Sequence, residues 1–303
     1  MKVLEPNPRL AFFGSPIEAA KVLAHLITSG LIPVVVVSNP DARRSRGNAV
    51  SPTPVTRLAR EHGIDLCYEP KDVAQYGFDL GIVVAYGRIL REETLALAPF
   101  VNLHFSLLPA WRGAAPVERA ILAGDAVTGV SLMEVVAGLD EGAVYASHQV
   151  VIRQPPNASI VRGELAEIGA EILLQHLRVG AKAFAAPKEQ VGEVTYAKKI
   201  TSEDLRIDFT QSANYIVRQI GVGGAWCLLE GKRVKFLSGR VTDVANLPEH
   251  DLILPPGAMV DRFVVCGEGL LELQVLQVEG KKPTDTSDWI RGQANSATRA
   301  VFS

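Results

Sequence analysis

The sequence predicts an α/β fold: a Rossmann-like, doubly wound and mostly parallel sheet, followed by a small β-barrel domain. The first observation is that short apolar runs alternate with longer amphipathic segments through residues 10–177, with glycine and proline between them. The second is that the segments beyond residue 220 are mostly short and strand-like. The third is the length of 303 residues, which suits two domains better than one.

The first predicted strand is the apolar run at 10–13, which Gly14 closes. Ser15 and Glu18 match a capping box with Pro16 at the first helical position, so we expect a helix from here to Gly30. The next elements follow from the same signals. They are strands at 32–37, 80–85, 101–104, 128–136 and 143–152, and helices at 54–62, 92–98, 116–123 and 160–177.

The last third of the chain predicts a different architecture. Residues 183–193 have little apolar periodicity and indicate a linker, and a short helix is expected at 213–220. Short strands are predicted at 225–229, 233–237, 258–261, 263–266 and 270–278, with a hairpin turn at 230–232. We therefore expect an N-terminal domain at 1–183, a linker at 184–200 and a C-terminal domain at 201–303.

Composition narrows the class of protein. A formal net charge of -2 gives no overall attraction to nucleic acid, so any RNA contact must use local patches. Cys67, Cys227 and Cys266 match neither a disulfide framework nor a zinc site, which indicates a reducing compartment. The first predicted turn lacks the dinucleotide fingerprint G-x-G-x-x-G. Without a signal peptide or a membrane-length apolar run, we expect a cytoplasmic protein with no membrane, DNA or metal partner.

The most informative residues follow the predicted strand at 101–104. Asn102 and His104 share one face of that strand, at the end where α/β sheets open into a ligand crevice. Both offer hydrogen-bond donors, and Asp140, in a Gly-Leu-Asp-Glu-Gly segment, is expected to orient the imidazole and keep it protonated. Two donors backed by a carboxylate suit the oxyanion of an acyl or formyl transfer. No serine or cysteine elbow is visible nearby, which favours direct transfer between two bound substrates.

Each of these residues also has an ordinary structural interpretation. Asn102 can cap the backbone at the end of a strand, His104 can be a satisfied core histidine, and Asp140 can be a turn aspartate. The functional interpretation is favoured by the spacing. Asn-x-His, a Ser-Leu-Leu-Pro turn and Trp-Arg-Gly-Ala-Ala-Pro follow one another without interruption.

These motifs resemble the folate-dependent formyltransferases, and within them the enzymes that formylate methionyl-tRNA. The similarity runs nearly end to end, through Phe-Phe-Gly-Ser-Pro at 12–16, Val-Val-Ala-Tyr-Gly at 83–87, Tyr-Ala-Lys-Lys-Ile at 196–200 and Gly-Lys-Lys at 280–282. The Asn/His/Asp set and the Ser-Leu-Leu-Pro turn are shared by the whole superfamily, whereas Trp-Arg-Gly-Ala-Ala-Pro and the late Gly-Lys-Lys are typical of the tRNA enzymes. The resemblance implies an OB-like barrel for the C-terminal domain.

The resemblance also implies a site for 10-formyltetrahydrofolate, the formyl donor. In the family, the pterin ring is bound mostly through backbone groups of the strand end near residue 86 and of the loop before Asp140, and the Ser-Leu-Leu-Pro turn also contacts folate. The matching residues here are Tyr86, Gly87, Ser106, Leu107, Leu108, Pro109, Gly138 and Leu139.

Basic residues in two regions are expected to contact tRNA. Residues 38–52 form a long loop, which on composition alone is more simply a solvated, charged loop. By resemblance it is the insertion that approaches the acceptor arm, although Ser45 replaces the first glycine of the family's Gly-Arg-Gly. Guanidiniums suit this task because they grip phosphate and stack on unpaired bases. The expected tRNA contacts are Arg43, Arg44 and Arg46 in this loop, and Lys232 and Lys281 in the C-terminal domain.

The implied reaction transfers a formyl group from 10-formyltetrahydrofolate to the amine of methionyl initiator tRNA. Asn102 and His104 would stabilise the oxyanion, and Asp140 would orient His104 and accept a proton. A formyltransferase for a small amine, either a purine-precursor ribonucleotide or an amino sugar nucleotide, is an alternative. A formyltetrahydrofolate hydrolase would keep the same three residues, with water replacing the amine. A binding protein would not need all three.

Overall fold

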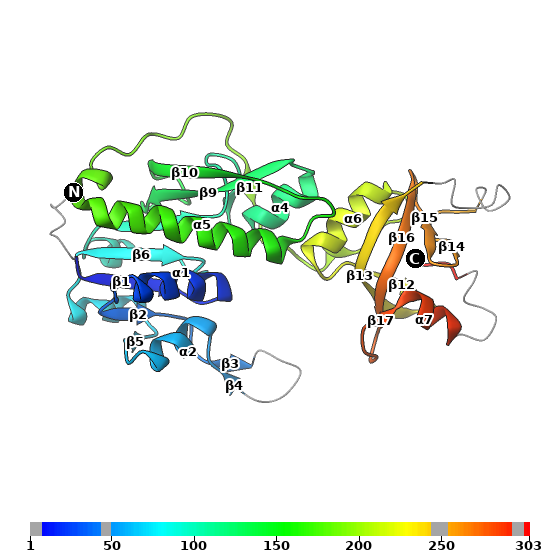
Figure 1. Cartoon of the computed structure of the whole chain (residues 1–303), viewed down its shortest axis with the longest axis horizontal. Coiled ribbons are helices and arrows are strands. Elements are labelled where there is room, and N and C mark those ends of the chain that lie inside the picture. The colour runs from blue at the N-terminus through cyan, green and yellow to red at the C-terminus, as the bar shows by residue number, and fades with distance from the viewer. Residues whose placement is uncertain (1–7, 44–49, 244–253, 293–299) are drawn as a thin grey trace. The chain divides into compact units, whose positions relative to one another are not determined.

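The computed structural model describes residues 8–43, 50–243, 254–292 and 300–303, and these divide into two units (Figure 1). The first unit takes in the described residues up to Pro116, together with Val127–Val150 and Val161–Lys198. The second takes in Val117–Ala126, Val151–Ile160 and the described residues from Lys199 onward. Most of the predicted linker at 184–200 thus packs with the first unit.

The described residues of the first unit form a seven-stranded sheet in the order β10-β9-β7-β6-β1-β2-β5. The strands from β7 to β5 in that order pair in parallel, and β9 joins β7 antiparallel. This confirms the predicted mostly parallel fold. The strands are β1 (Leu10–Gly14), β2 (Val35–Val37), β5 (Asp65–Cys67), β6 (Leu80–Val84), β7 (Phe100–His104), β9 (Val127–Glu134) and β10 (Val144–Val151).

Helices cover both faces of this sheet. On one face α1 and α5 lie side by side (Figure 1), joined by ion pairs from Glu18 to Arg162 at 2.8 Å and from Lys21 to Glu167 at 3.1 Å. On the other face, Phe13 and other buried side chains pack with η1 and α3. No described helix has both the length and the apolar character needed to cross a membrane. The helices are α1 (Ile17–Thr28), α2 (Pro54–Glu61), η1 (Pro70–Tyr76), α3 (Glu92–Leu95), α5 (Ala158–Val179) and η2 (Gly180–Phe184).

The predicted capping box at the start of α1 is wrong. Pro16 occupies the N-cap position, and no side-chain hydrogen bond caps this described end of the helix. The carboxylate of Glu18 pairs instead with Arg162 of α5. In this pair both the donor and the acceptor carry a charge, so the Glu18 carboxylate serves a tertiary contact instead of a local cap.

The described part of the second unit is built on a six-stranded sheet in the order β12-β13-β16-β15-β14, with β17 also pairing with β16. All of these pairs are antiparallel, including the predicted hairpin of β12 and β13, and the sheet shares one apolar core with α6. Strand β13 is longer than predicted, and β17 and α7 were not expected. The elements are α4 (Pro116–Ala123), η3 (Glu203–Leu205), α6 (Ala213–Val222), β12 (Trp226–Leu229), β13 (Lys232–Thr242), β14 (Met259–Val260), β15 (Phe263–Val265), β16 (Leu270–Val278), β17 (Thr284–Asp285) and α7 (Thr286–Arg291).

The strand order of the first sheet locates its ligand-binding edge. The chain leaves β1 for β2 on one side and later returns to β6 on the other, so the switch point lies between β1 and β6. Ligands of such sheets bind at the carboxyl ends of the strands around this point. The segments after β1 and β2 meet there, since the hydroxyl oxygens of Ser15 and Ser38 are 3.4 Å apart. Asn39 Nδ2 also donates to the carbonyl oxygen of Tyr86, after β6, at 3.2 Å.

In the second unit, a single carboxylate ties α4 to the start of the unit's C-terminal part. Asp204 Oδ1 accepts a hydrogen bond from Arg119 at 2.8 Å. Asp204 Oδ2 accepts from the backbone N–H and the hydroxyl of Thr201, at 2.8 and 2.7 Å. These bonds, the one from Arg119 foremost, hold the pKa of Asp204 well below its usual range.

We expect Asp204→Asn to lower the free energy of unfolding by about 1–3 kcal/mol at neutral pH, the usual effect of losing hydrogen bonds to a charged group. A depressed carboxyl pKa gives stability that is present above the unfolded-state value of about 3.9 and is lost as the pH falls through the folded-state value. In denaturant titrations the difference between parent and variant should therefore narrow progressively below about pH 4. Glu203→Gln, at an exposed neighbour, is the control. An equal loss in both variants would contradict this account.

Candidate active site

The carboxyl end of β7 carries two polar side chains on one face of the strand. Asn102 pairs with Val83 of β6, and His104 pairs with Ser131 of β9. Because side chains alternate along a strand, Asn102 and His104 share a face and Leu103 points to the other. His104 is only 5% exposed, whereas Asn102 is half-buried. The predicted pair thus lies at the ligand-binding edge of the sheet.

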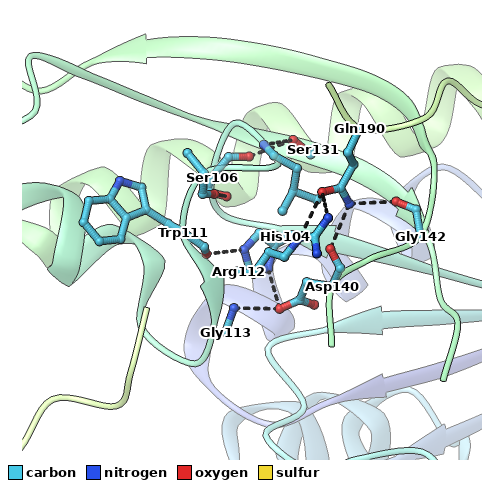
Figure 2. Close-up of polar contacts among 11 residues, drawn as sticks. His104, Ser106, Trp111, Arg112, Gly113, Ser131, Asp140, Gly142 and Gln190 are labelled. Atoms are coloured by element: carbon cyan, nitrogen blue, oxygen red, sulfur yellow. Dashed lines mark hydrogen bonds and ion pairs between the residues drawn. The ribbon is translucent and has the colours of Figure 1, made fainter. Parts of the chain in front are cut away.

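The imidazole of His104 has a polar neighbour at each ring nitrogen (Figure 2). Nε2 lies 2.8 Å from the carbonyl oxygen of Trp111. Because a carbonyl oxygen only accepts hydrogen bonds, Nε2 carries a proton and donates it. Nδ1 lies 3.6 Å from Asp140 Oδ2. One nitrogen is therefore committed to the backbone, and Nδ1 is the nitrogen available for proton transfer.

Asp140 reaches the imidazole from the tight loop between β9 and β10. Its backbone has φ of 51°, in the left-handed region that aspartate enters more readily than most residues. A Cβ on Gly142 would overlap the carbonyl group of Glu134, so this loop requires glycine there. Asp140 Oδ2 also accepts the N–H of Gly113 at 2.8 Å. The structure thus brings Asp140 and His104 together, beyond what a turn aspartate would do.

The predicted folate-binding turn follows β7 and is held by its own hydrogen bonds. The hydroxyl of Ser106 donates to the carbonyl oxygen of Ala110 at 2.6 Å. The hydroxyl of Ser131 donates to the carbonyl oxygen of Ser106 at 2.7 Å and accepts the N–H of Leu108 at 3.3 Å. The Ser106 hydroxyl is therefore committed to the shape of the turn. Within it Ser106 and Pro109 are buried, and Leu107 and Leu108 are half-buried.

The segment after β6 buries its aromatic side chain in the core of the first unit. The ring of Tyr86 is 2% exposed and meets Phe13 edge-on, with 5.8 Å between ring centroids. Burial raises the pKa of its phenol, which marks Tyr86 as a core side chain. Gly87 follows with φ of 75°, and in the other loop Leu139, after Gly138, is 58% exposed. Within the described ranges, no three His, Cys, Asp or Glu side chains gather as a metal ion would require.

Sequence reasoning missed the side chains that support the Asp140 loop. Gln190 Nε2 donates to the carbonyl oxygens of Asp140 and Gly142, both at 2.8 Å. Gln190 Oε1 accepts from Arg112, at 3.1 Å from Nε and 2.8 Å from a terminal guanidinium nitrogen. Thr195 Oγ1 accepts the N–H of Trp111 at 2.8 Å. Gln190 and Thr195 lie in the polar segment predicted to be a linker, and no local pattern marks them.

Of the five residues expected to contact tRNA, the structure describes three. Arg44 and Arg46 lie outside the described residues, and Arg43 ends β3 (Ala42–Arg43), which pairs antiparallel with β4 (Val50–Ser51). Lys232 begins β13, and Lys281 follows β16. These two lysines are exposed, and the start of β13 pairs with the end of β16. The sheet therefore brings the two basic stretches to the same end.

Family models match both parts of the chain. The model described as formyl transferase matches residues 8–177, and the one described as formyl transferase, C-terminal domain, matches residues 199–294. The chain belongs to the formyl transferase family. This establishes the resemblance that the motifs around Asn102, His104 and Asp140 first indicated.

Relatives and solved structures agree with this membership. The methionyl-tRNA formyltransferase of Paenarthrobacter aurescens is 39% identical over 311 residues, covering 97% of this chain and 99% of the relative. That of Corynebacterium efficiens is 37% identical over 306 residues, covering 94% and 96%. HypX from Aquifex aeolicus in complex with tetrahydrofolic acid shares the fold with a TM-score of 0.65 at 18% identity, over 94% of this chain and 47% of that one. An N-formyltransferase from Helicobacter canadensis has a TM-score of 0.65 at 14% identity, over 90% and 99%.

Asp140→Asn is expected to preserve the fold, because the amide oxygen can still accept the N–H of Gly113. It should lower kcat for formyl transfer by about 10²–10⁴-fold, the usual contribution of a positioned acid or base. The acid limb of the pH–rate profile should also change, because the variant lacks the carboxylate that faces His104. The measurement is kcat across a range of pH, with the melting temperature as the control for folding. If rate and profile both match those of the parent, Asp140 serves only the turn.

Proposed function

We propose that this protein transfers the formyl group of 10-formyltetrahydrofolate to the free amino group of methionyl initiator tRNA, which gives formylmethionyl-tRNA for translation initiation. The supporting observation is that relatives named methionyl-tRNA formyltransferase align over 94% and 97% of this chain, through both units. The geometry of His104 and Asp140 supports the same reaction, since it sets a donor and a carboxylate beside the ligand-binding edge.

In the proposed reaction the neutral amine attacks the formyl carbon. As the new C–N bond forms, the carbonyl electron pair moves to oxygen, and the resulting oxyanion accepts hydrogen bonds from the Asn102 amide and from Nδ1–H of His104. Asp140 accepts the proton that the attacking nitrogen loses, directly or through a water molecule. As the oxyanion electron pair re-forms the C=O bond, the bond to the folate nitrogen breaks, and that nitrogen keeps the electron pair and takes a proton from Nδ1 of His104. Asp140 then passes the proton that it accepted to Nδ1, which it faces, so both side chains return to their starting states. The amine thus loses the proton that the folate gains.

The folate donor is proposed to lie against backbone at two loops of the sheet edge. The left-handed backbone at Ala85 and Asp140, with φ of 44° and 51°, turns peptide groups at these loops away from regular strand pairing. Such groups suit the donors and acceptors of a pterin ring. The proposed contacts are the backbone of Tyr86, Gly87, Gly138 and Leu139 and the turn of Leu107, Leu108 and Pro109, whose shape Ser106 maintains.

The tRNA acceptor is proposed to contact basic side chains of both units. Lys232 and Lys281 lie at one end of the second sheet, and next to them Arg233 stacks on Trp226, 4.0 Å from the ring centroid. Cationic groups at one edge of a sheet suit a phosphate backbone. Arg43, Arg44 and Arg46 are proposed to contact the same tRNA. A charged tRNA as the acceptor also agrees with a cytoplasmic location, which stays a proposal.

The direct test is formylation of methionyl initiator tRNA with 10-formyltetrahydrofolate, run beside glycinamide ribonucleotide and an amino sugar nucleotide. We expect kcat/KM on the tRNA to exceed that on either small amine by at least about 10³-fold, because the smaller substrates leave the tRNA contacts unmade. The Asn102→Ala variant, which lacks one of the two proposed oxyanion donors, is the matched control for the chemical step. Preference for a small amine would refute the proposed acceptor, and rapid release of formate without any acceptor would indicate the hydrolase instead.

A further inference from the structure

Residues 188–197, which we call the strap, follow η2 in the sequence and contact the candidate active site. The strap begins at Lys188, whose backbone exchanges two hydrogen bonds with Val144 of β10, at 2.7 and 2.8 Å. It ends at β11 (Tyr196–Ala197), which pairs in parallel with β8 (Arg112–Gly113). Both ends are therefore anchored to the first unit, and between them Gln190 and Thr195 contact residues of the site.

Gln190 is the residue of the strap with the most polar contacts. Its amide nitrogen donates to two backbone carbonyl oxygens, and its amide oxygen accepts two N–H groups of Arg112 (Figure 2). The guanidinium of Arg112 only donates, so the amide can have just one orientation. Arg112 is itself 11% exposed and lies 3.4 Å from the carboxylate of Glu141. The Gln190 side chain is thus fixed in position and in direction.

The two carbonyl groups that accept hydrogen bonds from Gln190 belong to Asp140 and Gly142, in the loop of residues 138–142. Asp140 occupies left-handed backbone, which costs free energy unless neighbouring contacts maintain it. Asp140 is half-buried and Gly142 is buried, so their carbonyl oxygens, without the donor that Gln190 supplies, would favour a different loop conformation. The carboxylate on the same residue would then move away from His104, which it now faces at 3.6 Å.

The strap also supports the other partner of His104. Thr195 Oγ1 accepts a hydrogen bond from the backbone N–H of Trp111. The carbonyl oxygen of Trp111 in turn accepts a hydrogen bond from Nε2–H of His104. Trp111 has φ of 60°, a second left-handed residue in the site. Gln190 and Thr195, which are close in the sequence, therefore each hold one of the two groups that orient the imidazole.

We propose that Gln190 is a positioning residue for formyl transfer: through the backbone of the 138–142 loop, it sets the Asp140 carboxylate against Nδ1 of His104. The proposal rests on the proposed function, since formyl transfer is its main readout. It also places a support of the 138–142 loop beyond residue 183, so that a domain boundary at that residue would separate the loop from Gln190.

Two substitutions at Gln190 distinguish the loss of its amide donor from the loss of all its contacts. Gln190→Glu keeps the size and the acceptor for Arg112 but sets an oxygen against the two carbonyl groups, and Gln190→Ala removes the contacts altogether. Both should lower kcat by about 10–100-fold, since a displacement near 1 Å has effects of this size. KM for the tRNA should stay within about threefold, because the substitutions leave the proposed tRNA contacts in place. Val191→Ala, at a neighbouring side chain that is 88% exposed, should match the parent.

A double-mutant cycle distinguishes positioning from general support of the fold. If Gln190 acts through the Asp140 carboxylate, Gln190→Glu should lower kcat much less in the Asp140→Asn background than in the parent, because the carboxylate to be positioned is already absent. A loss of equal size in both backgrounds would overturn the proposal. So would a loss that appears in KM alone.

Hydrogen exchange of the Gly113 amide gives a readout independent of the substrate. This N–H donates to Asp140 Oδ2, so it should exchange faster in Gln190→Glu and Gln190→Ala and at the parental rate in Val191→Ala. Unchanged protection in all three variants would contradict positioning whatever the substrate. Failure of the parent protein to formylate tRNA, with the exchange pattern as expected, would instead count against the proposed function alone.

Discussion

The hydrogen bond from Nε2 of His104 to the carbonyl oxygen of Trp111 is the constraint on which the rest of the site depends. It fixes which ring nitrogen holds a proton at all times and leaves Nδ1 for exchange with substrate. Asp140 then has one place from which it can act, beside Nδ1. The features around it, including the left-handed backbone at Trp111 and Asp140, maintain these two contacts.

Segments far apart in the sequence supply this arrangement. The parallel sheet places His104 at the end of β7, next to the switch point where such sheets bind ligands. The loop after β9 brings the carboxylate, and the strap brings the hydrogen bonds that hold both orienting groups. The geometry of the candidate site is therefore a tertiary property of the first unit. The antiparallel sheet of the second unit adds exposed lysines at one of its ends.

Local pattern was enough to predict most of the fold and the centre of the site. The apolar run before His104 predicted a strand at 101–104, and β7 is Phe100–His104. The alternation within it placed Asn102 and His104 on one face. The rest depended on contacts between distant residues, which no local pattern encodes. Gln190 contacts a residue 50 positions earlier from a segment without periodicity, and Glu18 pairs across helices instead of capping its own.

The most direct test of the account is the proton distribution on the His104 ring, measured by nitrogen-15 NMR. The chain has six histidines, so the signals of His104 are assigned by their loss in a His104→Gln variant. The account predicts that the neutral ring carries its proton on Nε2, which donates to the carbonyl oxygen of Trp111. A neutral ring with the proton on Nδ1 and a bare Nε2 would contradict it.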